Sequence, residues 1–265
     1  CLFVHSDSST KAYQSLSGKY SGIEPPTWSL LLAESCRSKG FNVGILDCCA
    51  ENLGYEQATQ RIQEINAKIT LFVVYGQNPN AGTTSMIGAT GLAKCVYDAQ
   101  IDTKVGFVGS HVSALPKSVL ALDYVDFVLL NEGVYALRNF LTLKSFTPKN
   151  LSKIKGIAYR DGNKINFNLP EKLVPQERMD IDLPGYAWDL LPFKDKPLDL
   201  YRSPMWHAEY DFEKRTPYAA LQTSLGCRFG CDFCMINLIN RNNNDDVGVA
   251  GDYSFMRYWS PEFII

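Results

Sequence analysis

Three cysteines near the end of the chain are the residues whose types and spacing are best suited to chemistry. Cys227, Cys231 and Cys234 follow a C-x3-C-x2-C pattern on a glycine-containing loop, shortly after the apolar residues 218–221. Thiolates at this spacing can bind one iron-sulfur cluster, and a [4Fe-4S] cluster held by three cysteines keeps one iron open to a ligand from solution. The pattern therefore predicts a cluster with an open coordination position.

Two other interpretations of the same cysteines stay open: a zinc site and a set of buried, unreactive thiols. A structural zinc site is almost always closed by four ligands, and His207, the nearest candidate for the fourth, lies twenty residues before Cys227. A bacterial ferredoxin run would carry a fourth cysteine and a proline soon after, and neither follows here. The missing fourth ligand favours the iron-sulfur interpretation.

The cysteine pattern, with the aromatic Phe233 directly before the last cysteine, resembles that of the radical S-adenosylmethionine (SAM) enzymes. The resemblance implies that the three cysteines bind a [4Fe-4S] cluster and that Phe233 packs near the adenine of SAM. In that family the open iron chelates the amino and carboxylate groups of SAM. One electron from the cluster then cleaves the sulfonium to give a 5′-deoxyadenosyl radical. An external electron donor of the flavodoxin or ferredoxin type is implied as a partner.

Composition and charge exclude several classes of function. With 265 residues, 46% of them hydrophobic and 20% charged, the chain is long enough for about two globular domains. A formal charge of -2 shows no basic excess, so we expect no nucleic-acid partner. The longest apolar runs, such as residues 71–75, are too short to span a membrane. The eight cysteines do not resemble a disulfide framework, so we predict a cytoplasmic protein.

The first 145 residues alternate short β-rich apolar runs with helical patterns, which is typical of a parallel sheet covered on both faces. We expect strands at residues 2–5, 42–47, 70–75, 104–109 and 126–130. We expect helices at residues 27–39, 55–66, 84–100, 117–122 and 134–143. The predicted fold is a Rossmann-like or flavodoxin-like doubly wound α/β domain over residues 1–145. Right-handed crossovers would place all the carboxyl ends of its strands at one edge, where such folds bind ligands.

The loops at this edge carry a recognisable succession of residues. Residues 76–84, after the third expected strand, are small or carry amides and hydroxyls. Residues 109–116 read Gly-x-His-x-x-x-x-Pro, residues 125–128 read Val-Asp-Phe-Val, and Glu132-Gly133 precedes a helix. This succession resembles the cobalamin-binding domain that precedes the radical SAM barrel in a large class of enzymes.

The resemblance implies a set of cobalamin contacts in these loops. They are Gln77, Asn78, Thr83, Thr84, Gly109, Ser110, His111, Glu132 and Gly133. The alternative is that these residues only shape tight turns. Many cobalamin proteins supply a lower axial histidine from an Asp-x-His-x-x-Gly motif, whereas residues 47–54 contain no histidine. Radical SAM members commonly lack that histidine, so the departure is compatible with the resemblance.

The rest of the chain is expected to connect this domain to a barrel. Residues 156–160 and 164–167 predict a β-hairpin about a Gly-containing turn, and a proline-rich connector completes the region 146–217. Residues 218–265 resemble the truncated start of a (β/α) radical SAM barrel, with a first strand at 219–223. Ser260 is the expected N-cap of its first helix and Pro261 the first helical residue. Without barrel partners, we expect the segment after residue 218 to pack loosely.

The sequence thus resembles a fragment of a cobalamin-dependent radical SAM enzyme. The implied activity of the parent enzyme is transfer of a methyl group to an unactivated carbon or phosphorus centre of a small molecule or peptide. We expect the chain alone to be inactive, because most of a barrel is missing. Two alternatives stay open. One is a radical SAM enzyme for sulfur insertion or ring rearrangement with a cobalamin-free first domain. The other is a corrinoid-binding module without catalysis.

Overall fold

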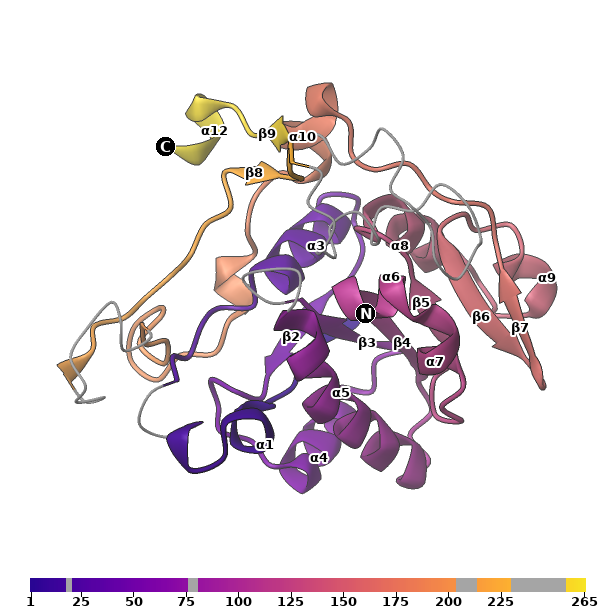
Figure 1. Ribbon diagram of the computed structural model, residues 1–265, viewed down its shortest axis with the longest axis horizontal. Helices are drawn as coiled ribbons and strands as arrows, with labels where there is room; N and C mark the ends of the chain where they lie inside the picture. Colours follow the sequence, from indigo (N-terminus) through magenta and orange to yellow (C-terminus); the bar gives the residue numbers. More distant parts are fainter. Residues whose placement is uncertain (18–20, 76–80, 204–213, 230–255) are drawn as a thin grey trace.

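The chain folds around one seven-stranded sheet with the order β2-β1-β3-β4-β5-β6-β7 (Figure 1). The computed structural model describes residues 1–17, 21–75, 81–203, 214–229 and 256–265. The strands are β1 (Leu2–His5), β2 (Gly44–Asp47), β3 (Ile69–Val74), β4 (Lys104–Gly109), β5 (Phe127–Leu129), β6 (Ile157–Asp161) and β7 (Lys164–Phe167). β1 to β5 pair in parallel, as predicted.

Helices cover both faces of the parallel strands. One face packs against α3 (Thr27–Arg37) and α8 (Val134–Leu141), and the other against α4 (Tyr55–Ile65), α5 (Ala81–Asp98) and α7 (Pro116–Leu120). All residues of β3 are buried, and Leu71 and Phe72 belong to the two different cores. A strand buried on both faces favours apolar side chains throughout, and the one polar residue of β3, Thr70, has its hydroxyl 2.9 Å from that of Thr103. The predicted doubly wound fold is confirmed.

Two element boundaries at the carboxyl edge differ from the prediction. α5 begins at Ala81, so Thr83 and Thr84 lie in its first turn and not in a loop. Residues after β4 form a second short helix, α6 (Ser110–Ala114), before α7. Pro116 cannot continue α6 but fits the first turn of α7. A five-residue helix is too short to show a helical period in the sequence.

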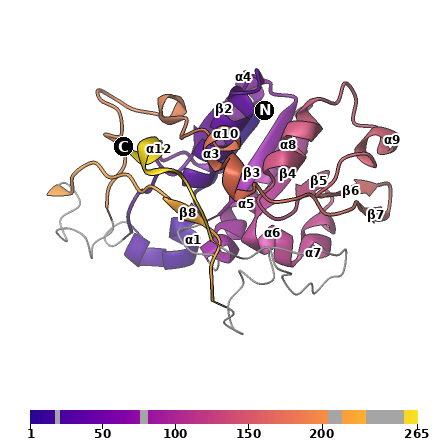
Figure 2. The same ribbon diagram turned by 90° about the horizontal axis from the view of Figure 1, so that it is seen from above.

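The hairpin β6–β7 extends the sheet, because β6 pairs antiparallel with β5. It lies with α9 (Pro148–Leu151) at the opposite side of the molecule from the C-terminus (Figures 1 and 2). The hairpin prediction is therefore confirmed.

The short elements α1 (Ser9–Tyr13) and η1 (Gln14–Leu16) follow β1 in the chain.

The described residues of the connector pack across α3 and α8. It contains η2 (Gln176–Arg178), α10 (Met179–Asp182) and η3 (Trp188–Leu190). Leu183, Ala187 and Tyr201 are fully buried in the same core as α3. The connector therefore forms an additional layer outside the helices of that face.

The last described residues form β8 (Ser224–Leu225), β9 (Arg257–Tyr258) and α12 (Pro261–Ile264). The predicted strand at 219–223 is wrong: β8 starts at Ser224, and the backbone N–H and C=O of Gln222 both bond the hydroxyl of Tyr186. The prediction of loose packing is wrong for residues 257–259, since Arg257 and Trp259 are buried. Ser260 caps α12 as predicted, its hydroxyl accepting from the N–H of Phe263 at 3.2 Å.

Candidate functional site

The carboxyl edge of β3 and β4 is closely packed because glycines stand where side chains would collide. A Cβ on Gly82 would lie 2.3 Å from the Ser110 hydroxyl oxygen and 2.7 Å from the Val74 carbonyl. Gly109 has φ 159° and ψ 175°, a conformation open essentially to glycine, and its Cβ would lie 2.4 Å from the same carbonyl. The first turn of α5 therefore rests directly on the ends of these strands.

Above this contact, three of the predicted ligand-binding residues present polar groups at the surface. Thr83 Oγ1 and His111 Nδ1 lie 3.2 Å apart, which joins the first turn of α5 to α6. Thr83 and Thr84 are exposed, and His111 is partly exposed. Partial burial lowers the pKa of His111, so its imidazole is neutral at pH 7. Two hydroxyls and a neutral imidazole suit an uncharged polar ligand.

Two aromatic residues that the sequence did not single out lie at the same edge. The rings of Trp28, at the start of α3, and Tyr75, directly after β3, are 5.1 Å apart. The Tyr75 hydroxyl donates to the Asn131 carbonyl at 2.8 Å, and the Asn131 N–H donates to the Ser113 hydroxyl at 2.8 Å. Burial raises the pKa of Tyr75, and the negative charge of Glu132 adds to this effect. The buried Trp28 Nε1 has no hydrogen-bond partner among the described residues.

The other predicted contacts fall into three groups. Gln77 and Asn78 lie outside the described residues. Gly109, Ser110 and Gly133 are buried, and Gly133 has the left-handed φ of 73° that starts α8. Glu132 is partly buried, and its carboxylate pairs with Arg257. Their predicted role as cobalamin contacts stays a prediction.

The stretch that lacks the expected axial histidine forms a closed turn. Asp47 Oδ1 accepts from the N–H groups of Cys49 and Ala50, each at 3.1 Å. Its Oδ2 accepts from the hydroxyl of Tyr201 at 2.9 Å, so the connector covers this carboxylate. Asp47 is thus a structural residue that joins β2 to the connector.

Cys227 is the predicted cluster ligand that the structure describes. It follows β8 closely and is partly exposed, and its Sγ accepts from the Phe229 N–H at 3.5 Å. Backbone N–H groups directed at cysteine sulfur are a usual feature of iron-sulfur loops. Cys231, Phe233 and Cys234 lie outside the described residues. Within the described part of the chain, no three His, Cys, Asp or Glu side chains gather as a metal site.

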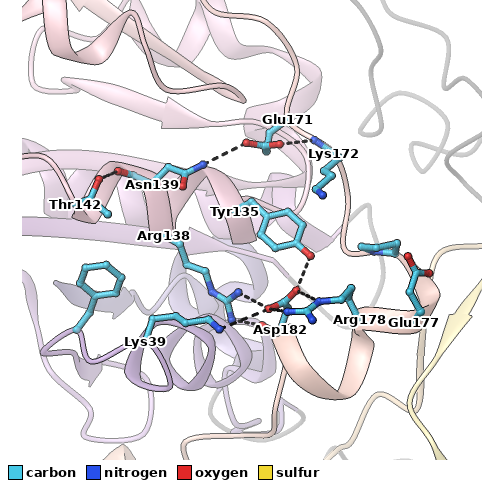
Figure 3. A pocket seen from close by; sticks show the side chains of 12 residues that line it. Lys39, Tyr135, Arg138, Asn139, Thr142, Glu171, Lys172, Glu177, Arg178 and Asp182 are labelled. Carbon is cyan, nitrogen blue, oxygen red and sulfur yellow. Dashed lines mark hydrogen bonds and ion pairs between the residues drawn. The ribbon is translucent and has the colours of Figure 1, made fainter.

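A pocket of about 710 Å³ lies away from this edge, between α8 and the connector (Figure 3). Its centre is Asp182, whose carboxylate accepts from Arg138 Nη1 at 2.8 Å, Arg178 Nε at 2.8 Å and the Tyr135 hydroxyl at 2.7 Å. Burial alone would raise the pKa of Asp182, but these hydrogen bonds hold it well below its usual range. The Asp182 carboxylate therefore fastens the connector to α8.

The sheet order and the ligand edge define an α/β domain of the class that binds cofactors at the carboxyl ends of its strands. Residues 14–141 match the family model of the B12 binding domain. Residues 14–141 are thus similar to a B12-binding domain, as the sequence resemblance implied.

Comparison with solved structures extends the likeness beyond this domain. The cobalamin-dependent SAM radical enzyme OxsB with aqua-cobalamin bound is similar over 99% of this chain and 30% of its own, with a TM-score of 0.64 and 15% identity. The radical SAM methyltransferase TsrM from Kitasatospora setae, with cobalamin and a [4Fe-4S] cluster bound, is similar over 99% of this chain and 44% of its own, with a TM-score of 0.60 and 11% identity. These likenesses show a shared fold.

A curated relative is also recognised by sequence. The uncharacterized methyltransferase PH0819 of Pyrococcus horikoshii is 26% identical over 215 residues, which cover 81% of this chain and 41% of the relative. The chain thus spans less than half the length of these relatives. Among the helices of the described residues, none combines the length and apolar character needed to cross a membrane.

Proposed function

We propose that the chain binds cobalamin at the carboxyl edge of β3 to β5 and carries the cluster loop of a cobalamin-dependent radical SAM methyltransferase. The observation that supports this most is the edge itself: within the B12-binding domain, the exposed Thr83 and Thr84 and the partly exposed His111 surround close glycine packing. Trp28 Nε1, which has no partner within the described part of the chain, offers a buried donor at the same edge. The residues present therefore fit a large polar cofactor.

Each group of residues has a separate task in this proposal. Cys227, Cys231 and Cys234 hold a [4Fe-4S] cluster, and Phe233 lies beside the adenine of SAM. Cluster and SAM would supply a radical that removes a substrate hydrogen, and cobalamin would supply the methyl group. The edge residues orient the corrinoid, and the buried Asp47 and Asp182 fix the connector that joins the domain to the cluster loop.

The reaction proposed for the whole protein is methylation of an unactivated carbon or phosphorus centre in a small molecule or peptide. Two similar proteins, PH0819 and TsrM, are named as methyltransferases, which supports methyl transfer over sulfur insertion or ring rearrangement. A flavodoxin-type or ferredoxin-type protein is the proposed electron donor. The cytoplasm, where thiols stay reduced, is the proposed location.

Thr83→Val is expected to weaken the binding of hydroxocobalamin by about twofold to tenfold, because it removes one hydrogen-bonding hydroxyl at the edge. Binding is measured by incubation with hydroxocobalamin, gel filtration and the corrinoid absorbance that elutes with the protein. Thr90→Val is the matched control, since Thr90 lies on the same helix and its hydroxyl bonds the Met86 carbonyl at 2.7 Å.

The outcomes of this experiment separate the candidate functions. No retention of corrinoid by the unaltered chain would overturn the proposal and favour a radical SAM enzyme with a cobalamin-free first domain. Equal losses in the two threonine variants would show that the ligand does not contact the start of α5. Corrinoid retention by a chain that takes up no iron in a separate anaerobic reconstitution would favour a binding module without catalysis.

A further inference from the structure

One buried ion pair holds the strand pair β8–β9 against the B12-binding domain. Arg257, in β9, donates from Nη1 to Glu132 Oε2 at 3.0 Å and from Nη2 to Glu132 Oε1. The Arg257 side chain is 2% exposed and that of Glu132 12%. Arg257 also donates to the Val174 carbonyl at 2.7 Å, while its buried Nε has no partner among the described residues. A buried guanidinium needs a carboxylate, and the one it pairs with here is Glu132.

Glu132 lies at the carboxyl edge of the sheet, where we propose that cobalamin binds. It lies in the loop between β5 and α8, next to Asn131, whose carbonyl accepts the Tyr75 hydroxyl at 2.8 Å. Its carboxylate is bound to Arg257 in a bidentate pair, the geometry that fixes position most firmly. Glu132 therefore links the edge loop to a segment far along the chain.

That segment leads directly to the first cluster cysteine. Arg257 stands opposite Leu225 in the antiparallel pair β8–β9, and Cys227 follows β8 closely. Leu225 is buried in the core that also contains Trp259. A shift of Arg257 would therefore displace β8 and the start of the cysteine loop.

Further contacts of β9 and of the residues after it come from the connector. The side-chain amide of Gln176 bonds both the N–H of Tyr258, at 2.8 Å, and its carbonyl, at 2.9 Å. Asp180 Oδ1 accepts from the Ser260 N–H at 3.0 Å, and Trp259 Nε1 donates to the Leu183 carbonyl at 2.9 Å. These contacts also anchor β9 but do not involve the loop after β5.

We propose that Glu132 is a positioning residue: through Arg257 and β8 it sets the place of Cys227 relative to the cobalamin edge. The same loop is thereby coupled to both cofactor sites, so cobalamin bound at the edge steadies β8–β9. The carboxylate serves the ion pair and does not contact the corrinoid. The identity of the two cofactors rests on the proposed function, whereas the positioning by Glu132 does not.

Hydrogen–deuterium exchange, followed by mass spectrometry of peptides over residues 222–229 and 256–262, tests this positioning. Glu132→Gln is expected to speed exchange there by at least about tenfold, because it leaves the buried Arg257 without a charge partner. Exchange in β1, β3 and β4 stays unchanged. In the unaltered chain, hydroxocobalamin slows exchange in both peptides, and in Glu132→Gln it does not.

Asp180→Asn is the matched control. It weakens a connector contact of the Ser260 N–H and leaves the Glu132–Arg257 pair intact. Exchange should rise in this variant too, but hydroxocobalamin should still slow it. Should Glu132→Gln lose protection throughout the sheet, the double variant Glu132→Gln with Arg257→Met removes the unpaired charge and restores a comparable fold.

Different results would contradict the positioning role, the coupling and the proposed function. Unchanged exchange over residues 222–229 and 256–262 in Glu132→Gln would overturn the positioning role, whatever the ligand. Slowing by hydroxocobalamin in Glu132→Gln equal to that in the unaltered chain would overturn the coupling. If the unaltered chain retains no corrinoid, the proposed function fails, and the ligand-free comparison still decides whether Glu132 positions β8–β9.

Discussion

Asp182→Asn is expected to lower the free energy of unfolding by about 3–5 kcal/mol, because it removes the buried charge that compensates the buried Arg138. Arg138 donates to Asp182 at 2.8 Å, and its side chain is 9% exposed, so water cannot replace the lost carboxylate. The amide has nearly the same shape, which keeps cavity formation out of the effect. Urea denaturation followed by circular dichroism measures the change.

The pH dependence of the same variant provides a second readout. The hydrogen bonds to Asp182 lower its pKa below that of the unfolded chain. Its stabilisation is therefore fully present above the unfolded pKa of about 4 and is lost as the pH falls through that value toward the folded pKa. The difference in stability between the unaltered chain and Asp182→Asn should be constant above about pH 5 and shrink below about pH 4.

Asp189→Asn is the matched control for Asp182. Asp189 also pairs with an arginine, Arg37 at 2.6 Å, but its side chain is 63% exposed. Its replacement should cost less than about 1 kcal/mol, since solvent screens an exposed pair. Equal losses in the two variants would show that Asp182 is hydrated in solution and does not fasten the connector.

Cys227→Ala is expected to reduce the iron bound after anaerobic reconstitution with ferrous iron and sulfide by about tenfold or more, since even altered outer contacts of a metal site cost that much. The broad visible absorption of the cluster should disappear with the iron. The Phe229 N–H directed at Cys227 Sγ supports the choice of this cysteine. Iron and acid-labile sulfide per chain are the quantities to measure.

Cys95→Ala is the matched control for the cluster. Cys95 is another partly exposed free cysteine, on α5, and no cluster role is proposed for it. Its loss should leave iron uptake unchanged. Zinc retained by the unaltered chain without any uptake of iron would contradict the cluster and favour the structural zinc interpretation.

The features that could be predicted from the sequence are those that depend on residues close together in the chain. Apolar runs such as β3 and the periodic pattern of α8 predicted the sheet and its covering helices, because each strand or helix carries its own period. The spacing of the cysteines predicted a cluster loop for a similar reason. α6 was missed because its five residues, Ser110–Ala114, are too few to show a helical period.

The roles of the individual ligand-binding residues were predicted less well from the sequence. The resemblance to the cobalamin-binding domain gave Thr83, Ser110 and Glu132 the same expected role, but their surroundings differ. Thr83 is exposed, Ser110 is buried under α5, and Glu132 is bound to Arg257. Trp28 and Tyr75 were overlooked because an aromatic residue at the end of an apolar element is usually a core residue.

By itself, the sequence determined the class of fold, the edge at which a ligand is predicted to bind and the three cysteines that predict a cluster. Only the tertiary structure decided how these parts are joined. Glu132 and Arg257 are 125 residues apart, and Asp47 and Tyr201 are 154 residues apart. A charged or hydrogen-bonded pair at such separation leaves no local pattern, because its partners meet only after the core has brought their elements together.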